Sequence, residues 1–154
     1  MTRRRQRTTR LGCTTQCCEA VADVFYRNPP DPRAPELAPD DQGWIWLPTN
    51  ALAEAFAQHA GDREHAVLAA ARRPIAVAYI QKPVPEPGWK ELPTWHPIAE
   101  EDRMINPATQ KFMAARMNAH TRTHRVDHAP LISRPEVVTE ILAEAIRAVS
   151  VPMS

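Results

Sequence analysis

The chain has 154 residues, of which 44% are apolar and 24% charged, so it can bury one core of moderate size as an ordinary globular domain. No stretch of about 18 apolar residues is present, and we therefore expect no membrane-spanning helix. The formal net charge of +1 is unevenly distributed, because residues 1–18 hold five Arg and no acid while the remainder is net negative.

Residues 1–27 are predicted to be a basic, poorly ordered N-terminal segment. Its arginines are not followed by the apolar stretch of a secretion signal or accompanied by a nucleic-acid-binding motif, so we expect neither export nor nucleic-acid binding. All three cysteines lie in it, at Cys13, Cys17 and Cys18. Two are adjacent and no fourth exists, which argues against disulfides and a zinc site and favours a reducing, cytoplasmic location.

Residues 28–92 are predicted to form a Pro-rich linker followed by a helical, lid-like region. Five prolines within residues 28–39 prevent a regular helix or strand there. Good helix formers between turn residues predict two short helices, at 51–60 and 62–73. The stretch 74–93 is expected to be irregular, because several further prolines interrupt it.

Residues 93–150 are predicted to be an α/β core segment. Short β-rich runs at 94–99 and 120–126 alternate with helical runs, and this alternation predicts two parallel strands joined by a helix. Pro97 lies within the first run. Because proline has no N–H to donate, we expect it to disturb the hydrogen-bond ladder of that strand.

The two helices of this segment have recognisable starts. Asn106 is expected to cap the first helix, with Pro107 in its first turn. Ser133 and Glu136 have the spacing of a capping box at the start of the second. The second helix also carries a wide apolar stripe, which implies a sheet for it to cover. The stripe consists of Val137, Val138, Ile141, Leu142, Ala145, Ile146 and Val149.

An acid and a base follow the two predicted strands. Asp102 comes after the first strand and His128 after the second. Neighbouring parallel strands present their carboxyl ends at the same edge of a sheet, so we expect the Asp102 carboxylate to lie around 3 Å from the His128 ring. His124 remains an alternative base, because the connection that precedes His128 is short.

Three histidines recur at every fourth position, at His120, His124 and His128. The β-branched residues between them favour a strand, on which residues four apart are separated by about 13 Å. That separation is too large for one metal ion. We therefore predict neither a metal nor any other cofactor.

Three motifs in order resemble the C-terminal part of the α/β-hydrolase superfamily. They are Glu-Glu-Asp-Arg-Met-Ile-Asn-Pro (100–107), Gln-Lys-Phe-Met-Ala-Ala-Arg-Met (110–117) and His-Ala-Pro-Leu-Ile-Ser-Arg-Pro-Glu (128–136). The likeness is strongest to small serine esterases related to plant methylesterases and hydroxynitrile lyases. A weaker likeness to the lid of that family runs through Gly-Trp-Ile-Trp-Leu-Pro (43–48) and Ala-Glu-Ala-Phe-Ala-Gln-His-Ala (53–60).

This resemblance implies a truncated α/β-hydrolase fold, with a small parallel sheet, flanking helices and a helical lid. It also implies that Asp102 and His128 are the acid and the histidine of a catalytic triad that acts on small ester-like substrates. In this fold the triad follows the chain order nucleophile, acid, base. Asp102 and His128 are in the order that this rule requires.

The nucleophile that the triad needs is absent from the sequence. The motif Gly-x-Ser-x-Gly places that serine on a strained turn, yet the serines are Ser133, Ser150 and Ser154, all after the acid and without flanking glycines. Cys17 and Cys18 also lack small flanking residues and a preceding apolar strand. We therefore expect the chain by itself to be inactive.

Two classes of function remain open. One is an ester-type hydrolase homologue that retains the acid and the histidine of the triad. The other is a non-catalytic fragment or interaction protein, which could associate with itself through an exposed sheet edge.

Overall fold

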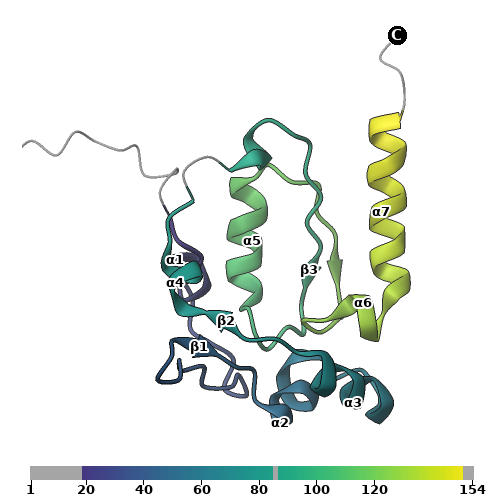
Figure 1. Cartoon of the computed structure of the whole chain (residues 1–154). Coiled ribbons are helices and arrows are strands. Elements are labelled where there is room, and N and C mark those ends of the chain that lie inside the picture. The colour runs from purple at the N-terminus through teal and green to yellow at the C-terminus, as the bar shows by residue number, and fades with distance from the viewer. Residues whose placement is uncertain (1–18, 85–86, 151–154) are drawn as a thin grey trace, which may run out of the picture.

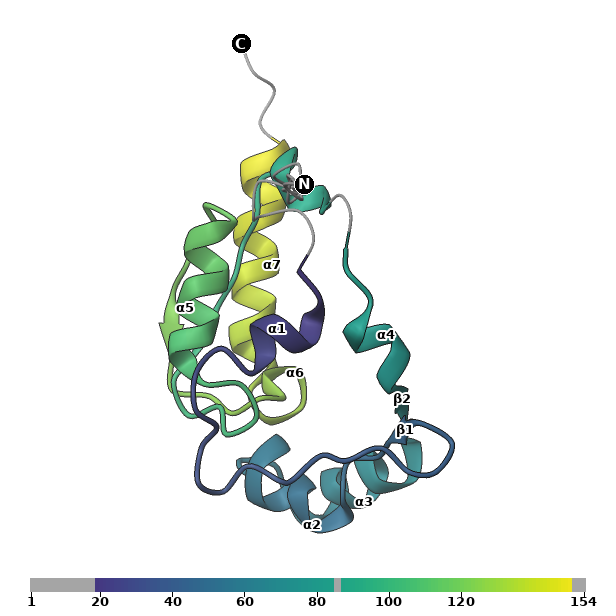
Figure 2. The ribbon, with the colours of Figure 1, turned by 90° about the vertical axis from the view of Figure 1, so that its left-hand side faces the viewer.

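The computed structural model describes residues 19–84 and 87–150. The predictions for the basic segment before residue 19, including its cysteines, lie outside the described residues. Figure 1 shows the strands β3 (Ile98–Ala99) and β4 (Thr123–His124) between the helices α5 (Pro107–Arg116) and α7 (Pro135–Ser150). The axes of α5 and α7 run in nearly the same direction in this view and in Figure 2, which is turned by 90°.

The two strands are parallel, as the alternation of strands and helices predicts. Ile98 pairs with Thr123 and Ala99 with His124, and a parallel bridge between Trp95 and His120 extends the contact. The strand–helix–strand–helix order of this part of the chain is confirmed. The carboxyl ends of both strands therefore point toward one end of the domain.

Pro97 does not interrupt the pairing with β4, so the expected disturbance of this ladder is wrong. The N–H groups of His96 and Ile98 donate to the carbonyl groups of His120 and Arg122, at 3.0 and 2.8 Å. Successive backbone amides of a strand point to opposite edges. The amide position of Pro97 consequently lies on the edge away from β4, where its missing N–H is not needed for this pairing.

Asn106 caps α5 as predicted. Its Oδ1 accepts the N–H of Ala108 at 2.8 Å, and Pro107 is the first helical residue. Proline is well tolerated there because the first N–H groups of a helix have no partner within the helix. Thr109, Gln110 and Ala114 form the buried face of α5, which packs against β3.

The predicted capping box of α7 is wrong. Ser133 is the last residue of a separate short helix, α6 (Pro130–Ser133), and its hydroxyl donates to Asp127 at 2.6 Å. Glu136 instead pairs with Arg134. A local spacing rule failed here because a buried carboxylate outside the helix is the stronger acceptor for the serine hydroxyl.

The apolar stripe of α7 is largely uncovered, contrary to the expectation that a sheet covers it. None of the residues of α7 is buried. Leu142, Ile146 and Val149 are 57%, 61% and 62% exposed. A pair of strands with two residues each offers too little surface to cover a helix of 16 residues.

The lid-like region contains more regular structure than the sequence predicts. Its elements are β1 (Trp44–Ile45), α2 (Thr49–Ala51), the π-helical turn η1 (Leu52–Phe56), α3 (Asp62–Ala71), β2 (Ile75–Ala76), α4 (Val77–Gln81) and the 3-10 turn η2 (Gly88–Lys90). A further short helix, α1 (Val21–Phe25), precedes this region and lies within the segment 1–27 that was predicted to be poorly ordered. The expected helix over 51–60 is thus shorter and partly π-helical. The stretch 74–93 is not wholly irregular, since β2 pairs antiparallel with β1.

The helices α2 and α3 of the lid-like region lie beyond the carboxyl ends of β3 and β4 (Figure 1). The small apolar residues Ala51, Leu52, Ala55 and Ala57 of this region are buried, as are Ile98, Ala99 and Val126 around the parallel strands. Within residues 19–84 and 87–150, no helix combines the length and the apolar character needed to cross a membrane.

Candidate active site

Asp102 is held firmly in the turn that follows β3. Its Oδ1 accepts the N–H groups of Met104 and Ile105 at 2.7 and 2.8 Å. Its Oδ2 accepts Nε2–H of Gln110 at 2.8 Å. The side chain is buried, and the surrounding donors suit a carboxylate, which only accepts hydrogen bonds.

His128 meets Asp102 from the turn that follows β4. The distance from His128 Nδ1 to Asp102 Oδ2 is 3.0 Å, so the predicted contact is present in the structure. Because the carboxylate accepts, the neutral imidazole carries its proton on Nδ1 and has its lone pair on Nε2. No described residue forms a hydrogen bond with Nε2, which therefore remains free to accept a proton.

The alternative base, His124, does not contact Asp102. It lies within β4, and its Nε2 is buried without a hydrogen-bond partner among the described residues. His120 stacks on Trp95, with 5.0 Å between the ring centroids. The three regularly spaced histidines are thus in three different environments. In the part of the chain that the structure describes, no group of three metal-ligating side chains is assembled.

Asp127 fixes the turn that carries His128, a role that the sequence analysis missed. Its side chain is 0% exposed and accepts hydrogen bonds from Ala129 N–H, Ser133 Oγ–H and the backbone N–H of His59, at 3.1, 2.6 and 2.9 Å. One carboxylate therefore links β4, α6 and the lid-like region. The sequence did contain a feature that points to Asp127, because it is a charged residue at the end of a predicted strand and directly precedes the candidate histidine.

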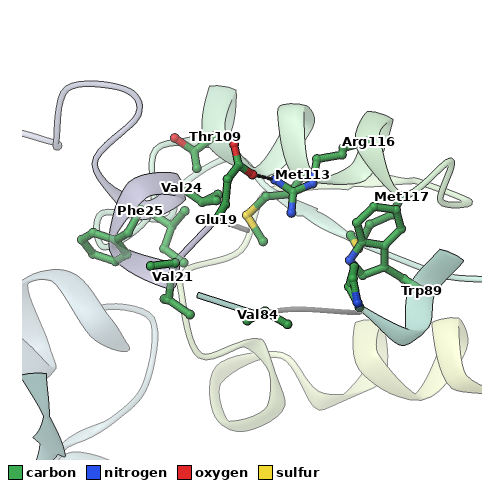
Figure 3. Close-up of a pocket in the computed structure, with 13 residues that line it drawn as sticks. Glu19, Val21, Val24, Phe25, Val84, Trp89, Thr109, Met113, Arg116 and Met117 are labelled. Carbon is green, nitrogen blue, oxygen red and sulfur yellow. Dashed lines mark hydrogen bonds and ion pairs between the residues drawn. The ribbon is translucent and has the colours of Figure 1, made fainter. Parts of the chain in front are cut away.

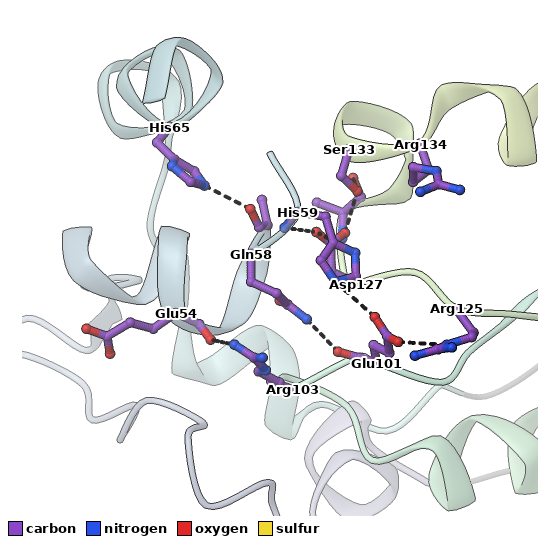
Figure 4. A network of polar contacts seen from close by, with 12 residues as sticks. Glu54, Gln58, His59, His65, Glu101, Arg103, Arg125, Asp127, Ser133 and Arg134 are labelled. Atoms are coloured by element: carbon purple, nitrogen blue, oxygen red, sulfur yellow. Dashed lines mark hydrogen bonds and ion pairs between the residues drawn. The ribbon is translucent and has the colours of Figure 1, made fainter. Parts of the chain in front are cut away.

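Further polar contacts join the lid-like region to the site (Figure 4). Glu101, next to Asp102, accepts Nε2–H of Gln58 through its carbonyl group at 2.6 Å. The Glu101 carboxylate meets His59 Nε2 at 2.9 Å and Arg125 Nε at 3.0 Å. Phe56 packs against the His128 ring, with centroids 5.0 Å apart. The lid-like region thus covers part of the acid–histidine pair.

Comparisons with known proteins identify this arrangement at the level of the fold. No protein-family model matches the sequence, and no curated protein matches it significantly. Two crystal structures of polyneuridine aldehyde esterase, one of them of a histidine-to-alanine mutant, are similar to it, with TM-scores of 0.57 and 0.62 and sequence identities of 16% and 14%. The similarity covers 80% and 82% of this chain.

The chain has the fold of part of an α/β-hydrolase. It spans about half the length of the two solved structures, since the match covers 50% and 56% of those chains in the same order. In an α/β-hydrolase, the acid of the triad precedes the histidine in the chain. In this chain Asp102 and His128 follow the parallel strands β3 and β4, with the acid before the histidine.

The serine motif of a nucleophile is not found near His128 in the sequence. Ser133 is the serine nearest to His128 in the sequence, and its hydroxyl donates to Asp127 rather than to the imidazole. The sequence contains no Gly-x-Ser-x-Gly motif. Among the described residues, no hydroxyl or thiol forms a hydrogen bond with His128 Nε2.

A separate apolar cavity of about 310 Å³ lies between α1, α5 and the chain around Val84 and Trp89 (Figure 3). Met113 and Met117 of α5 line it, and Arg116 forms an ion pair with Glu19 at its edge. Neither Asp102 nor His128 lines this cavity. We therefore do not assign it to the acid–histidine pair.

Proposed function

We propose that the chain is an ester-hydrolase-type protein of the α/β-hydrolase superfamily, related to small serine esterases of the plant methylesterase and hydroxynitrile lyase kind. The observation that carries this proposal is the 3.0 Å contact between Asp102 Oδ2 and His128 Nδ1 after two parallel strands. The free Nε2 on the other side of the ring is what a general base of this class requires. The substrate class is a small-molecule ester, and the site of action is the cytoplasm.

In this proposal the two residues have the roles of acid and base in a triad. His128 Nε2 takes the proton of a nucleophilic hydroxyl during attack on the ester carbonyl and returns it to the leaving alcohol. Asp102 holds the ring with its proton on Nδ1 and stabilises the imidazolium that forms. The bonds from Met104 and Ile105 keep the carboxylate fixed during this transfer.

The same proposal predicts that the chain by itself does not hydrolyse esters, because the sequence supplies no nucleophile elbow. Purified protein should turn over p-nitrophenyl acetate no faster than buffer, and a fluorophosphonate probe should label no residue. His128→Ala is the matched control. Turnover that disappears in this variant, or a labelled side chain, would contradict the prediction.

The proposed roles of Asp102 and His128 as acid and base have a separate test. The coding DNA upstream of this chain, read in all frames, should encode a strand followed by Gly-x-Ser-x-Gly. If it does, co-expression of that segment with the chain should restore hydrolysis of p-nitrophenyl acetate, and Asp102→Asn should reduce it about 10⁴-fold, as loss of the orienting acid does in serine proteases. A restored activity that ignores Asp102→Asn would show that this acid is not part of the site.

The exposed face of α7 favours a second candidate function, that of an interaction protein that associates with itself. Leu142, Ile146 and Val149 project from one side of this helix and are more than half exposed. We place the self-association on α7 rather than on the outer edge of β3, because Pro97 lacks an N–H there. Burying the two faces against each other would remove apolar area from water.

Light scattering after gel filtration tests this second candidate. The wild-type chain should form a dimer at high micromolar concentration, and Leu142→Lys should shift it to the monomer. Glu140→Lys on the same helix, which changes the charge without touching the apolar face, is the control. A wild-type monomer at all concentrations would refute self-association.

A further inference from the structure

We propose that Gln110 is a positioning residue that sets the orientation of Asp102 and thereby the tautomer of His128. This inference rests on the proposed roles of Asp102 and His128 as acid and base. Gln110 opens the motif that follows the acid in the sequence and lies in the first turns of α5. It is 4% exposed, so its polar side chain must find its partners within the protein.

The amide of Gln110 has one orientation that satisfies its surroundings. Its Oε1 accepts the backbone N–H of Ala99 at 2.8 Å. Its Nε2 donates to Asp102 Oδ2 at 2.8 Å and to the carbonyl group of Ile105 at 3.1 Å. A flipped amide would direct its oxygen at a carboxylate and a carbonyl, and its NH₂ group at another N–H. The hydrogen-bond network therefore assigns the amide without ambiguity.

The contact with Ala99 ties this amide to the strand that carries the acid. The N–H of Ala99 points away from β4, since the neighbouring amides of Ile98 and Glu100 donate to that strand. At this edge the amide of Gln110 takes the place of a neighbouring strand. Gln110 thus connects the end of β3 directly to the turn that holds Asp102.

Gln110 and His128 share one oxygen of the acid. Oδ2 accepts Gln110 Nε2–H and contacts His128 Nδ1, whereas Oδ1 accepts the N–H groups of Met104 and Ile105. The backbone donors hold only Oδ1, so the carboxylate could still rotate and move Oδ2 away from the imidazole. The donor from Gln110 prevents this rotation and keeps Oδ2 directed at the imidazole.

Nuclear magnetic resonance of the ¹⁵N-labelled full chain tests this role without reference to activity. In the wild type with the imidazole in its neutral form, the two ring nitrogens of His128 should have well-separated ¹⁵N shifts, as expected for a single tautomer with the proton on Nδ1. Gln110→Met, which has similar volume and no donor, should bring the two shifts toward each other. Gln58→Met, which removes a glutamine that bonds only Glu101, should leave them separated. His128→Ala assigns the ring signals.

A pH titration of the wild-type chain, followed by the same method, tests the link between Gln110 and His128 without any substitution at Gln110. The side-chain amide resonances of Gln110 should shift with the midpoint of His128, because both groups bond one carboxylate oxygen. A Gln110 amide that does not respond, or a folded Gln110→Met variant with the wild-type ring shifts, would overturn the inference. If the shifts behave as expected while the ester assays and the upstream search fail, the proposed function falls and the positioning role stands.

Discussion

Replacing Asp127 by Ala should strongly destabilise the fold. The Asp127 side chain is fully buried and accepts three hydrogen bonds, from Ala129 N–H, Ser133 Oγ–H and His59 N–H. Each donor left without a partner in the interior costs about 1–3 kcal/mol. We expect the free energy of unfolding to fall by about 3 kcal/mol or more.

The matched control is Asp31→Ala, which makes the same chemical change near the surface. Asp31 also accepts three hydrogen bonds, all from Arg33, and the resulting ion pair keeps the pKa of Asp31 below its usual value. Because the partner remains exposed to water when the carboxylate is removed, the loss there should stay below about 1 kcal/mol. Urea unfolding, followed by circular dichroism, measures both variants.

The structural consequence of Asp127→Ala should also reach the candidate site. Asp127 joins the turn before His128 to α6 and to the lid-like region, so its loss frees the ring from the position in which Nδ1 meets Asp102. The separated ¹⁵N ring shifts of His128 should collapse in this variant. A variant that unfolds within about 0.5 kcal/mol of the wild type would refute the argument that these three bonds hold the turn.

Two further predictions concern the stability of the α/β segment. Asn106→Ala removes the acceptor for Ala108 N–H and should lower the free energy of unfolding by about 1 kcal/mol in urea. A decrease in the free energy of unfolding below ~0.3 kcal/mol would contradict the role of Asn106 as the helix cap. Burial lowers the pKa of His96 in the folded chain. As the pH falls, the unfolded chain therefore binds a proton at His96 at a higher pH than the folded chain does. The free energy of unfolding should consequently fall as the pH drops below about 6.5. In His96→Gln the free energy of unfolding should change less between pH 7.5 and 5.5 than in the wild type. An equal change in both proteins would contradict this prediction.

Local caps and the consequences of the order of strands and helices were predictable from the sequence. Asn106 caps α5 because a cap needs only the N–H two residues later. The parallel pairing of β3 and β4 followed from the alternation of strands and a helix. The contact of Asp102 with His128 followed from chain order, since parallel neighbours present their carboxyl ends together.

Features that depend on partners far along the chain were decided only by the tertiary structure. Ser133 has the spacing of a helix cap, yet its hydroxyl bonds the buried Asp127, because a desolvated carboxylate attracts donors more strongly than a solvated helix end. Pro97 has no N–H to donate to a strand ladder, but its amide position lies at the edge away from β4, where this pairing needs no donor. The acid and histidine were visible in the sequence, whereas Gln110 and Asp127, which hold them, became apparent only when folding brought their donors and acceptors together.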